Sequence, residues 1–153
     1  MDIKKPINKI KIVERIFLAG TIDMGNSFDW QKQITELLEN SGHDITIYNP
    51  RRDDWDSSWK QEINDPQFNH QVTWELTCLE KADLVIMYFG PESKSPISLL
   101  ELGLFKHKII CYCPDEFYRK GNVDIVGKRY GFPIYKNLDE FLDEIGNRLS
   151  QEV

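Results

Sequence analysis

The sequence contains only three cysteines, and their spacing is typical of neither a disulfide framework nor a zinc site. Cys78 stands alone, while Cys111 and Cys113 form a C-x-C pair. The three histidines are scattered along the chain, and no H-E-x-x-H helix occurs. These absences give no indication of a metal site, and unpaired cysteines are typical of the reducing cytoplasm.

Long hydrophobic runs and an excess of positive charge are also absent. No apolar run approaches the roughly 20 residues of a membrane-spanning helix, and the first ten residues lack the apolar stretch of a signal peptide. The net charge is −6, whereas nucleic-acid binding depends on Lys and Arg that neutralise phosphates. We therefore expect a cytoplasmic protein without a membrane or nucleic-acid polymer as partner. A local basic pocket for one small anionic ligand is still compatible with this charge.

The composition is that of an ordinary globular protein. The chain has 153 residues, of which 41% are hydrophobic and 29% are charged. This length suits one domain with one substantial core, and no repeat or linker interrupts it. We therefore expect a single domain over residues 1–153.

Apolar runs alternate with amphipathic stretches along the chain. The runs predict buried strands at 15–20, 44–50, 83–90, 108–113 and 132–135. Helices are predicted at 27–42, 67–82, 95–107 and from 137 onward, with long loops at 51–66 and 114–131. This alternation predicts an α/β three-layer sandwich of the flavodoxin-like or Rossmann-like kind, with a five-stranded parallel sheet in the order 2-1-3-4-5. Ligands of such folds bind at the carboxyl ends of the strands.

Two of the predicted helices carry more detailed expectations. Ser27 is the predicted N-cap of the first helix. Val72, Leu76 and Leu79 have the spacing of a buried face on the second.

The turn after the first strand resembles a phosphate-binding loop but lacks its cation. Gly20, Gly25 and Ser27 fit the pattern G-x-x-x-x-G-K-[ST], yet Asn26 stands at the position of the lysine. One interpretation is that Gly20 only lets the chain turn. The other is that Gly20 and Thr21 form the floor of a small-ligand pocket through their backbone N–H groups.

Glu101 is the most unusual residue of the sequence, because apolar residues surround it in "ISLLELGLF". An ionised carboxylate in apolar surroundings costs several kcal/mol unless it is paired, and no Lys or Arg stands three or four residues away. Either Glu101 reaches solvent beside Lys94 and Ser98, or it is held at a pocket as a nucleophile or base. Glu75 is a second candidate, either a solvated helix carboxylate or the partner of Glu101 in acid–base chemistry.

Three segments together carry a resemblance to a known family. The segments "IFLAG", "WELTCLEKADLVIMYF" and "SPISLLELGLF" resemble the nucleoside 2-deoxyribosyltransferase superfamily, most closely its deoxyribosyltransferase-like branch. The resemblance implies cleavage of the N-glycosidic bond of a nucleoside or its 5′-monophosphate, with no metal or organic cofactor. It also implies that Glu101 is the nucleophile of a covalent glycosyl-enzyme and that Glu75 protonates the departing base.

The same resemblance implies several substrate-binding residues. Ser95 stands where the transferases carry an Asp that binds the 5′-hydroxyl, and a serine hydroxyl can donate to a phosphate instead. Ser98 belongs to the same motif. The segment "NPRRDDW" is similar to an Arg-bearing segment of cytidine monophosphate hydrolases. This similarity implies that Asn49 contacts the substrate and that Arg51 or Arg52 binds its phosphate. The alternative is that the two arginines lie in a solvated loop.

Two further expectations concern the base and the oligomeric state. Trp55 or Trp59 is a candidate to stack on the base, or else packs in the core or a lid. Family members are dimers or larger, and a neighbouring subunit completes each pocket. The resemblance therefore implies that Asn122, with Arg119 behind it, is contributed to the neighbour's pocket. The alternative is that residues 117–131 form a structural loop with solvated charges. The alternative function from another class is a nucleotide-binding sensor or accessory module without turnover.

Overall fold

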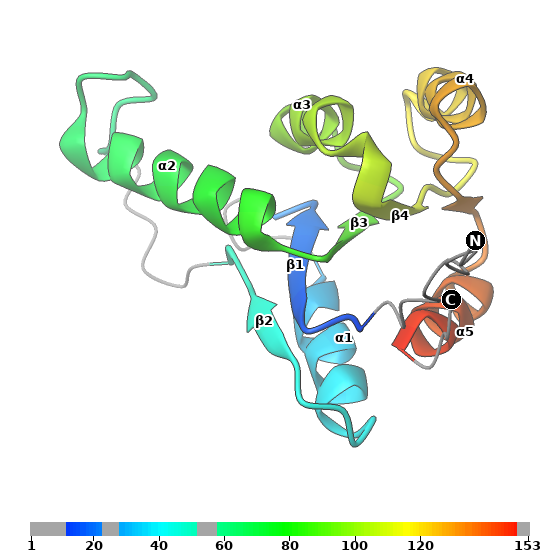
Figure 1. Ribbon diagram of the computed structural model, residues 1–153. Helices are drawn as coiled ribbons and strands as arrows, with labels where there is room; N and C mark the ends of the chain where they lie inside the picture. The colour runs from blue at the N-terminus through cyan, green and yellow to red at the C-terminus, as the bar shows by residue number, and fades with distance from the viewer. Residues whose placement is uncertain (1–11, 23–27, 52–57, 150–153) are drawn as a thin grey trace, which may run out of the picture.

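The computed structural model describes residues 12–22, 28–51 and 58–149, and its centre is a parallel sheet (Figure 1). The five strands are ordered β2-β1-β3-β4-β5, and every neighbouring pair is parallel. The predicted strand order is therefore confirmed. Central strands of such a sheet are covered on both faces, which explains why β3 is apolar along its whole length.

Strands and helices alternate along the chain. The strands are β1 (Arg15–Gly20), β2 (Thr46–Tyr48), β3 (Leu84–Tyr88), β4 (Ile109–Tyr112) and β5 (Ile134–Tyr135). The helices are α1 (Trp30–Glu39), α2 (Pro66–Lys81), α3 (Pro96–Leu104), the short 3-10 helix η2 (Lys106–Lys108), α4 (Lys120–Tyr130) and α5 (Leu138–Leu149).

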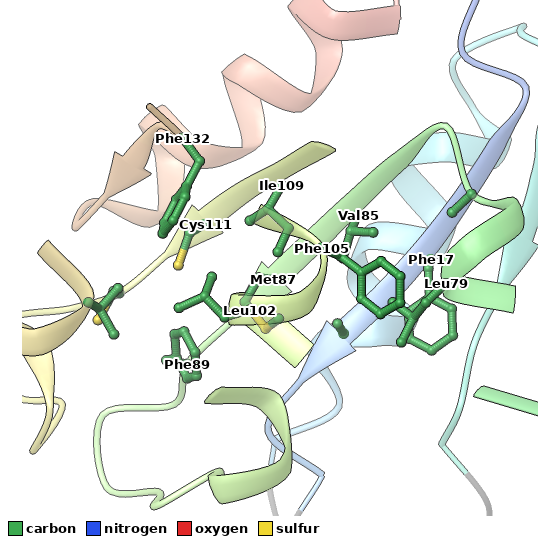
Figure 2. Close-up of a cluster of buried hydrophobic side chains, with 14 of the residues drawn as sticks. Phe17, Leu79, Val85, Met87, Phe89, Leu102, Phe105, Ile109, Cys111 and Phe132 are labelled. Atoms are coloured by element: carbon green, nitrogen blue, oxygen red, sulfur yellow. The ribbon is translucent and has the colours of Figure 1, made fainter. Parts of the chain in front are cut away.

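The helices form two layers, one on each face of the sheet. Figure 1 shows α2, α3 and α4 on one face and α1 and α5 on the other. A separate apolar cluster fills each interface. Figure 2 shows the cluster under α2 and α3, where Leu79 and Leu102 contribute to the same core as Phe17, Met87 and Phe89. The three-layer architecture is as predicted.

The opposite cluster contains a row of aromatic rings. The rings of Trp30 and Tyr88 stack with centroids 4.9 Å apart, and Tyr88 stacks on Tyr112 at 4.8 Å. Phe141 from α5 continues the row at 5.7 Å from Tyr112. These contacts fix α1 and α5 against the ends of β3 and β4, where ligands of this fold class bind.

The K-A-D sequence before β3 has a structural explanation. One oxygen of Asp83, Oδ2, accepts hydrogen bonds from the backbone N–H groups of Glu14 and Arg15 at 3.0 and 2.9 Å, and so ties β1 to β3. Lys108 donates from Nζ to the carbonyls of Leu79 and Ala82 at the end of α2. Lys108 thus caps the carboxyl end of α2, the helix that carries Glu75.

Two local predictions about the helices need correction. The cap of α1 is Asp29, which accepts a hydrogen bond from the N–H of Lys32, whereas the predicted cap Ser27 lies outside the described residues. Of the three residues predicted to face the core from α2, only Leu79 is buried, while Val72 and Leu76 are each 36% exposed. The core stripe of α2 is therefore shorter than the apolar spacing predicts.

The predicted loop 114–131 contains the helix α4. Its sequence "KGNVDIVGKRY" includes two glycines, which lower helix propensity by about 1 kcal/mol each relative to alanine. Packing compensates, because Val123 and Gly127 are buried against the sheet. Gly131 ends the helix with a left-handed backbone at φ 79°.

Candidate active site

The ends of β1 and β3 meet closely at Gly20. This glycine lies beside Tyr88 and has a φ of 139°, and a Cβ there would lie 2.1 Å from the Tyr88 carbonyl oxygen. The next residue, Thr21, donates its N–H to the same oxygen at 3.0 Å. The Trp30 indole donates to the carbonyl of Thr21 at 2.8 Å and so holds the turn from the other side.

Three buried hydroxyl groups gather where these strands end. Oγ1 of Thr21 lies 2.7 Å from Oγ of Ser95 and 2.9 Å from Oγ of Ser93, and the two serine oxygens are 3.0 Å apart. The N–H of Gly90 donates to Oγ1 of Thr21 at 2.8 Å, and Oγ of Ser93 donates to the carbonyl of Gly90 at 2.9 Å. Segments more than 70 residues apart in the sequence thus form one polar cluster.

Ser95 has a strained backbone within this cluster. Among the described residues it is the only one other than glycine with a positive φ, at 48°. Ser95 precedes α3 as its N-cap, but its side chain makes no capping bond, because Oγ contacts Thr21 and Ser93 instead. Strain of this kind often marks a functional site. At Ser95 this backbone conformation joins the hydroxyl cluster to the first turn of α3.

Glu101 lies buried on α3, with 8% of its surface exposed. Within the described part of the chain, no hydrogen bond or ion pair reaches its carboxylate. Burial, together with the negative charge of Glu75, raises the pKa of Glu101 to about 8. The structure therefore excludes the interpretation of Glu101 as a solvated surface carboxylate.

Glu75 comes from the helix α2 and is half-buried. The buried Gln71, one turn earlier, donates from Nε2 to Oε1 of Glu75 at 3.2 Å. Burial raises the pKa of Glu75, and the hydrogen bond from Gln71 opposes this effect. Two carboxyl groups whose charges interact resist ionising together, so the pair favours a state with one proton. Such a pair can supply a nucleophile and an acid at the same time.

A cleft of about 360 Å³ opens between the segment after β2 and the helix α2, which carries Glu75. Its walls are Asn49 and Pro50, which follow β2, and His70, Gln71 and Trp74 on α2. Gln71 therefore touches both the cleft and the carboxylate. His70, Gln71 and Trp74 were not predicted as site residues from the sequence. The only sequence signal was an aromatic residue on a polar stretch of helix next to Glu75.

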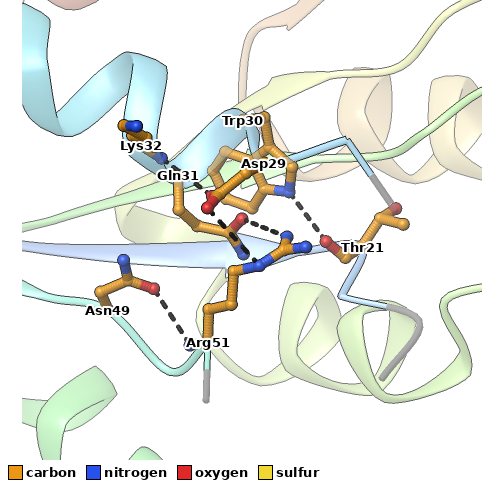
Figure 3. A network of polar contacts seen from close by, with 7 residues as sticks. All are labelled: Thr21, Asp29, Trp30, Gln31, Lys32, Asn49 and Arg51. Carbon is orange, nitrogen blue, oxygen red and sulfur yellow. Dashed lines mark hydrogen bonds and ion pairs between the residues drawn. The ribbon is translucent and has the colours of Figure 1, made fainter. Parts of the chain in front are cut away.

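Arg51 is directed toward α1 by a network of polar contacts (Figure 3). Its Nη1 donates to Oε1 of Gln31 at 3.2 Å, and its Nε lies 3.7 Å from Oδ2 of Asp29. The backbone N–H of Arg51 donates to Oδ1 of Asn49 at 3.0 Å. The side chain of Arg51 is only 9% exposed, so Arg51 is not a solvated loop residue.

Residues 13–117 match the model of the family described as nucleoside 2-deoxyribosyltransferase like. The chain belongs to this family. A crystal structure of a conserved protein from Enterococcus faecalis V583 has the same fold, with a TM-score of 0.64, 15% identity, and coverage of 90% of this chain and 99% of that chain. No curated protein matches the sequence.

The remaining predicted site residues of this deoxyribosyltransferase-like protein differ in how deeply they are buried. Ser98 is buried one turn before Glu101 on α3. Asn122 lies exposed on the first turn of α4, without a hydrogen bond to the other candidate residues of the described chain. Arg52 and Trp55 lie outside the described residues. Trp59 is partly exposed in the segment before α2.

In the described ranges, no three His, Cys, Asp or Glu side chains gather as a metal-binding group. No helix of the described chain is long and apolar enough to span a bilayer.

Proposed function

We propose that the protein cleaves the N-glycosidic bond of a nucleoside or nucleoside 5′-monophosphate through a covalent intermediate on Glu101. The observation that carries the proposal is the burial of Glu101 without a cation or hydrogen-bond donor, close enough to Glu75 for the two charges to interact. A buried unpaired carboxylate is costly for folding and is common where it serves chemistry. Membership of the deoxyribosyltransferase-like family supports the same reaction class.

The proposed reaction has two steps. The ionised carboxylate of Glu101 attacks C1′ of the sugar, the C1′–N bond breaks, and its electron pair leaves with the base. Glu75 gives its proton to the departing nitrogen. Water or a second base then attacks C1′ and releases Glu101, which gives hydrolysis or transfer respectively. Water or an acceptor base loses its proton to Glu75, so the pair returns to its starting state.

Base release is the direct test. The protein is incubated with a panel of nucleosides and their 5′-monophosphates, with and without a free acceptor base, and the released base is separated and quantified. Intact mass spectrometry of the protein during turnover should show the added mass of one glycosyl group. No released base across the whole panel would contradict the proposal.

The proposed roles predict a bell-shaped dependence of base release on pH. The active form carries one proton on the pair, because Glu101 must be ionised and Glu75 protonated. Burial and the charge of ionised Glu75 raise the pKa of Glu101 to about 8, so above this pH neither carboxyl keeps a proton and the rate should fall. At low pH both carboxyls are protonated and the nucleophile is lost, so the rate should fall there also.

Replacing Glu75 with glutamine separates the two limbs of this profile. The variant should release base about 100- to 10 000-fold more slowly, which is the usual contribution of a general acid. Its rate should rise with pH to a plateau and no longer fall on the alkaline side. The midpoint of this rise should lie below 8, because the charge of Glu75 no longer raises the pKa of Glu101. An unchanged bell-shaped profile would exclude Glu75 as the acid.

We further propose that the 5′ end of the substrate lies at the hydroxyl cluster. Thr21 and Ser95 offer hydroxyl groups there, and α3 begins immediately after Ser95. Hydroxyls and the first N–H groups of a helix suit a phosphate, whereas a carboxylate at the same position would repel it. This favours a nucleoside 5′-monophosphate as substrate. Arg51 directly follows the cleft residues Asn49 and Pro50 in the sequence and remains a proposed substrate contact.

Replacing Ser95 with aspartate tests the phosphate position. The added negative charge should lower kcat/KM for a 5′-monophosphate about ten-fold or more relative to the free nucleoside. Ser95→Ala is the matched control, because it removes the hydroxyl without adding charge and should affect the two substrates more evenly. An equal loss on both substrates in Ser95→Asp would place the phosphate elsewhere.

We also propose that the protein is a homo-oligomer. Ile97, Leu100 and Leu104 lie on one face of α3 and are 61%, 62% and 53% exposed, so an apolar stripe stands uncovered on the helix that carries Glu101. A second copy on this stripe would bring its own surface near the site, and Asn122 is the proposed residue that it contributes. Light scattering during size-exclusion chromatography tests this, and a monomeric mass would contradict it.

A further inference from the structure

The cleft is connected to the carboxylate of Glu75 through one residue, Gln71. An acid protonates a leaving group only within hydrogen-bond reach or through one water. Gln71 joins the cleft to the carboxylate of Glu75 by its 3.2 Å hydrogen bond. If Glu75 is the acid, the base therefore lies in or next to this cleft.

The walls of the cleft suit a flat aromatic ring. Trp74 and His70 contribute rings from α2, and Pro50 faces them from the segment after β2. The indole of Trp74 is large and partly exposed, at 37%, so a ligand can reach it. Stacking of a base on an aromatic side chain typically strengthens binding by about 1–3 kcal/mol. The volume of about 360 Å³ is within the usual range of small-molecule sites.

The orientation of one amide in the cleft is fixed by the backbone. The N–H of Arg51 donates to Asn49, so the atom of Asn49 that faces Arg51 must be its oxygen. Figure 3 shows this contact, with the nitrogen of Asn49 on the other side of the amide. Within the described chain no hydrogen bond engages that nitrogen. Asn49 therefore offers the cleft a donor, and its matching group on a base is a carbonyl oxygen.

We infer that the cleft holds the base of the substrate, stacked on Trp74, and that Asn49 selects an oxo-base by donating to its carbonyl oxygen. This inference rests on the proposed function, because that function places Glu75 at the leaving group. It identifies the base class as uracil-like, cytosine-like or 6-oxopurine-like. Adenine lacks a carbonyl oxygen and is disfavoured.

Calorimetric titration of the complete protein with free bases tests the inference without turnover. The probes are uracil and hypoxanthine, which carry carbonyl oxygens, and adenine, which does not. The better of the two oxo-bases should bind about ten-fold more tightly than adenine. Equal binding of adenine and both oxo-bases would overturn the role of Asn49.

Replacing Trp74 with alanine should weaken oxo-base binding about ten-fold or more, and Trp74→Phe should restore most of it, because phenylalanine keeps an aromatic face. Thr77→Ala is the matched control, because Thr77 is exposed on the same helix outside the cleft. If Trp74→Ala binds the bases as the wild type does, the base lies elsewhere and the inference fails.

Replacing Asn49 with aspartate tests selection directly. Aspartate keeps the oxygen that accepts from the N–H of Arg51, so the local turn is retained, but it replaces the donor by an acceptor. The preference for oxo-bases over adenine should disappear. A preference that survives in Asn49→Asp would overturn the inference.

The binding assay and the base-release assay fail independently. The binding of a free base does not require Glu101. If free bases bind through Trp74 and Asn49 but no base is released from nucleosides, the proposed function is contradicted and the assignment of the cleft as the base site is supported. Base release with unchanged binding in Trp74→Ala would support the function and contradict the cleft.

Discussion

Glu101→Gln is expected to abolish base release, with a loss of about a thousand-fold or more, because an amide is a poor nucleophile. The same change should leave the fold intact. Glutamine has nearly the size of glutamate, and it removes a carboxylate that is buried without a hydrogen-bond partner in the described chain. The midpoint of thermal unfolding should therefore stay unchanged or rise, since the raised pKa of Glu101 shows that burying this carboxyl costs free energy at neutral pH.

The rate of base release and the unfolding midpoint are measured on the same preparations. Glu36→Gln is a suitable control, because Glu36 is exposed on α1 and should change neither quantity. Wild-type turnover in Glu101→Gln would remove the nucleophile assignment. If the wild-type protein binds a nucleotide but never releases base, and Glu101→Ala binds it with the same affinity, a sensor or accessory module becomes the better description.

Gly20→Ala is expected to have the largest effect on stability. A Cβ at this position would lie 2.1 Å from the Tyr88 carbonyl oxygen and 2.8 Å from its nitrogen, and these are backbone atoms of the central strand β3. The φ of 139° adds strain for any residue with a side chain. The free energy of unfolding should fall by about 3 kcal/mol or more, which is at the upper end for single substitutions.

Urea denaturation measures this loss, and Gly103→Ala provides the matched control. No atom lies within 4 Å of a Cβ built at Gly103, which is in the helix α3. Alanine favours a helix over glycine by about 1 kcal/mol, so Gly103→Ala should stabilise the protein slightly. If the two substitutions changed the free energy of unfolding by similar amounts, this would contradict the close contact between Gly20 and the backbone of Tyr88.

The sheet could be predicted from the sequence because its signals are local. The run "LVIMYFG" is almost wholly apolar, as a central parallel strand tends to be, and the regular alternation of strands and helices along the chain indicates a parallel sheet. The helix α4 could not be predicted, because Gly121 and Gly127 lower its local propensity and only burial against the sheet compensates.

The site could be predicted only where one residue conflicts with its neighbours. Glu101 was identified because a carboxylate among leucines is energetically unfavourable unless it has a function. The structure shows that this carboxylate is buried. The contact of Ser93 with Thr21 spans 72 residues, and no local pattern encodes it. Trp74 likewise could not be assigned to the cleft, since Asn49 and Pro50, which follow β2, line the cleft with it only in the folded chain. The catalytic and binding roles of these residues remain predictions.

The left-handed backbone at Ser95 bears on how substrate preference changes among related enzymes. This conformation excludes most side chains, but aspartate and asparagine adopt it more readily than other residues with a Cβ. The resemblance places an aspartate at this position in the transferases. Under the proposed function, a change of substrate from a nucleoside 5′-monophosphate to a free nucleoside then requires only that aspartate replace Ser95. The backbone conformation at this position does not have to change. The preference for one substrate or the other can therefore change in evolution while the segment before α3 keeps its structure.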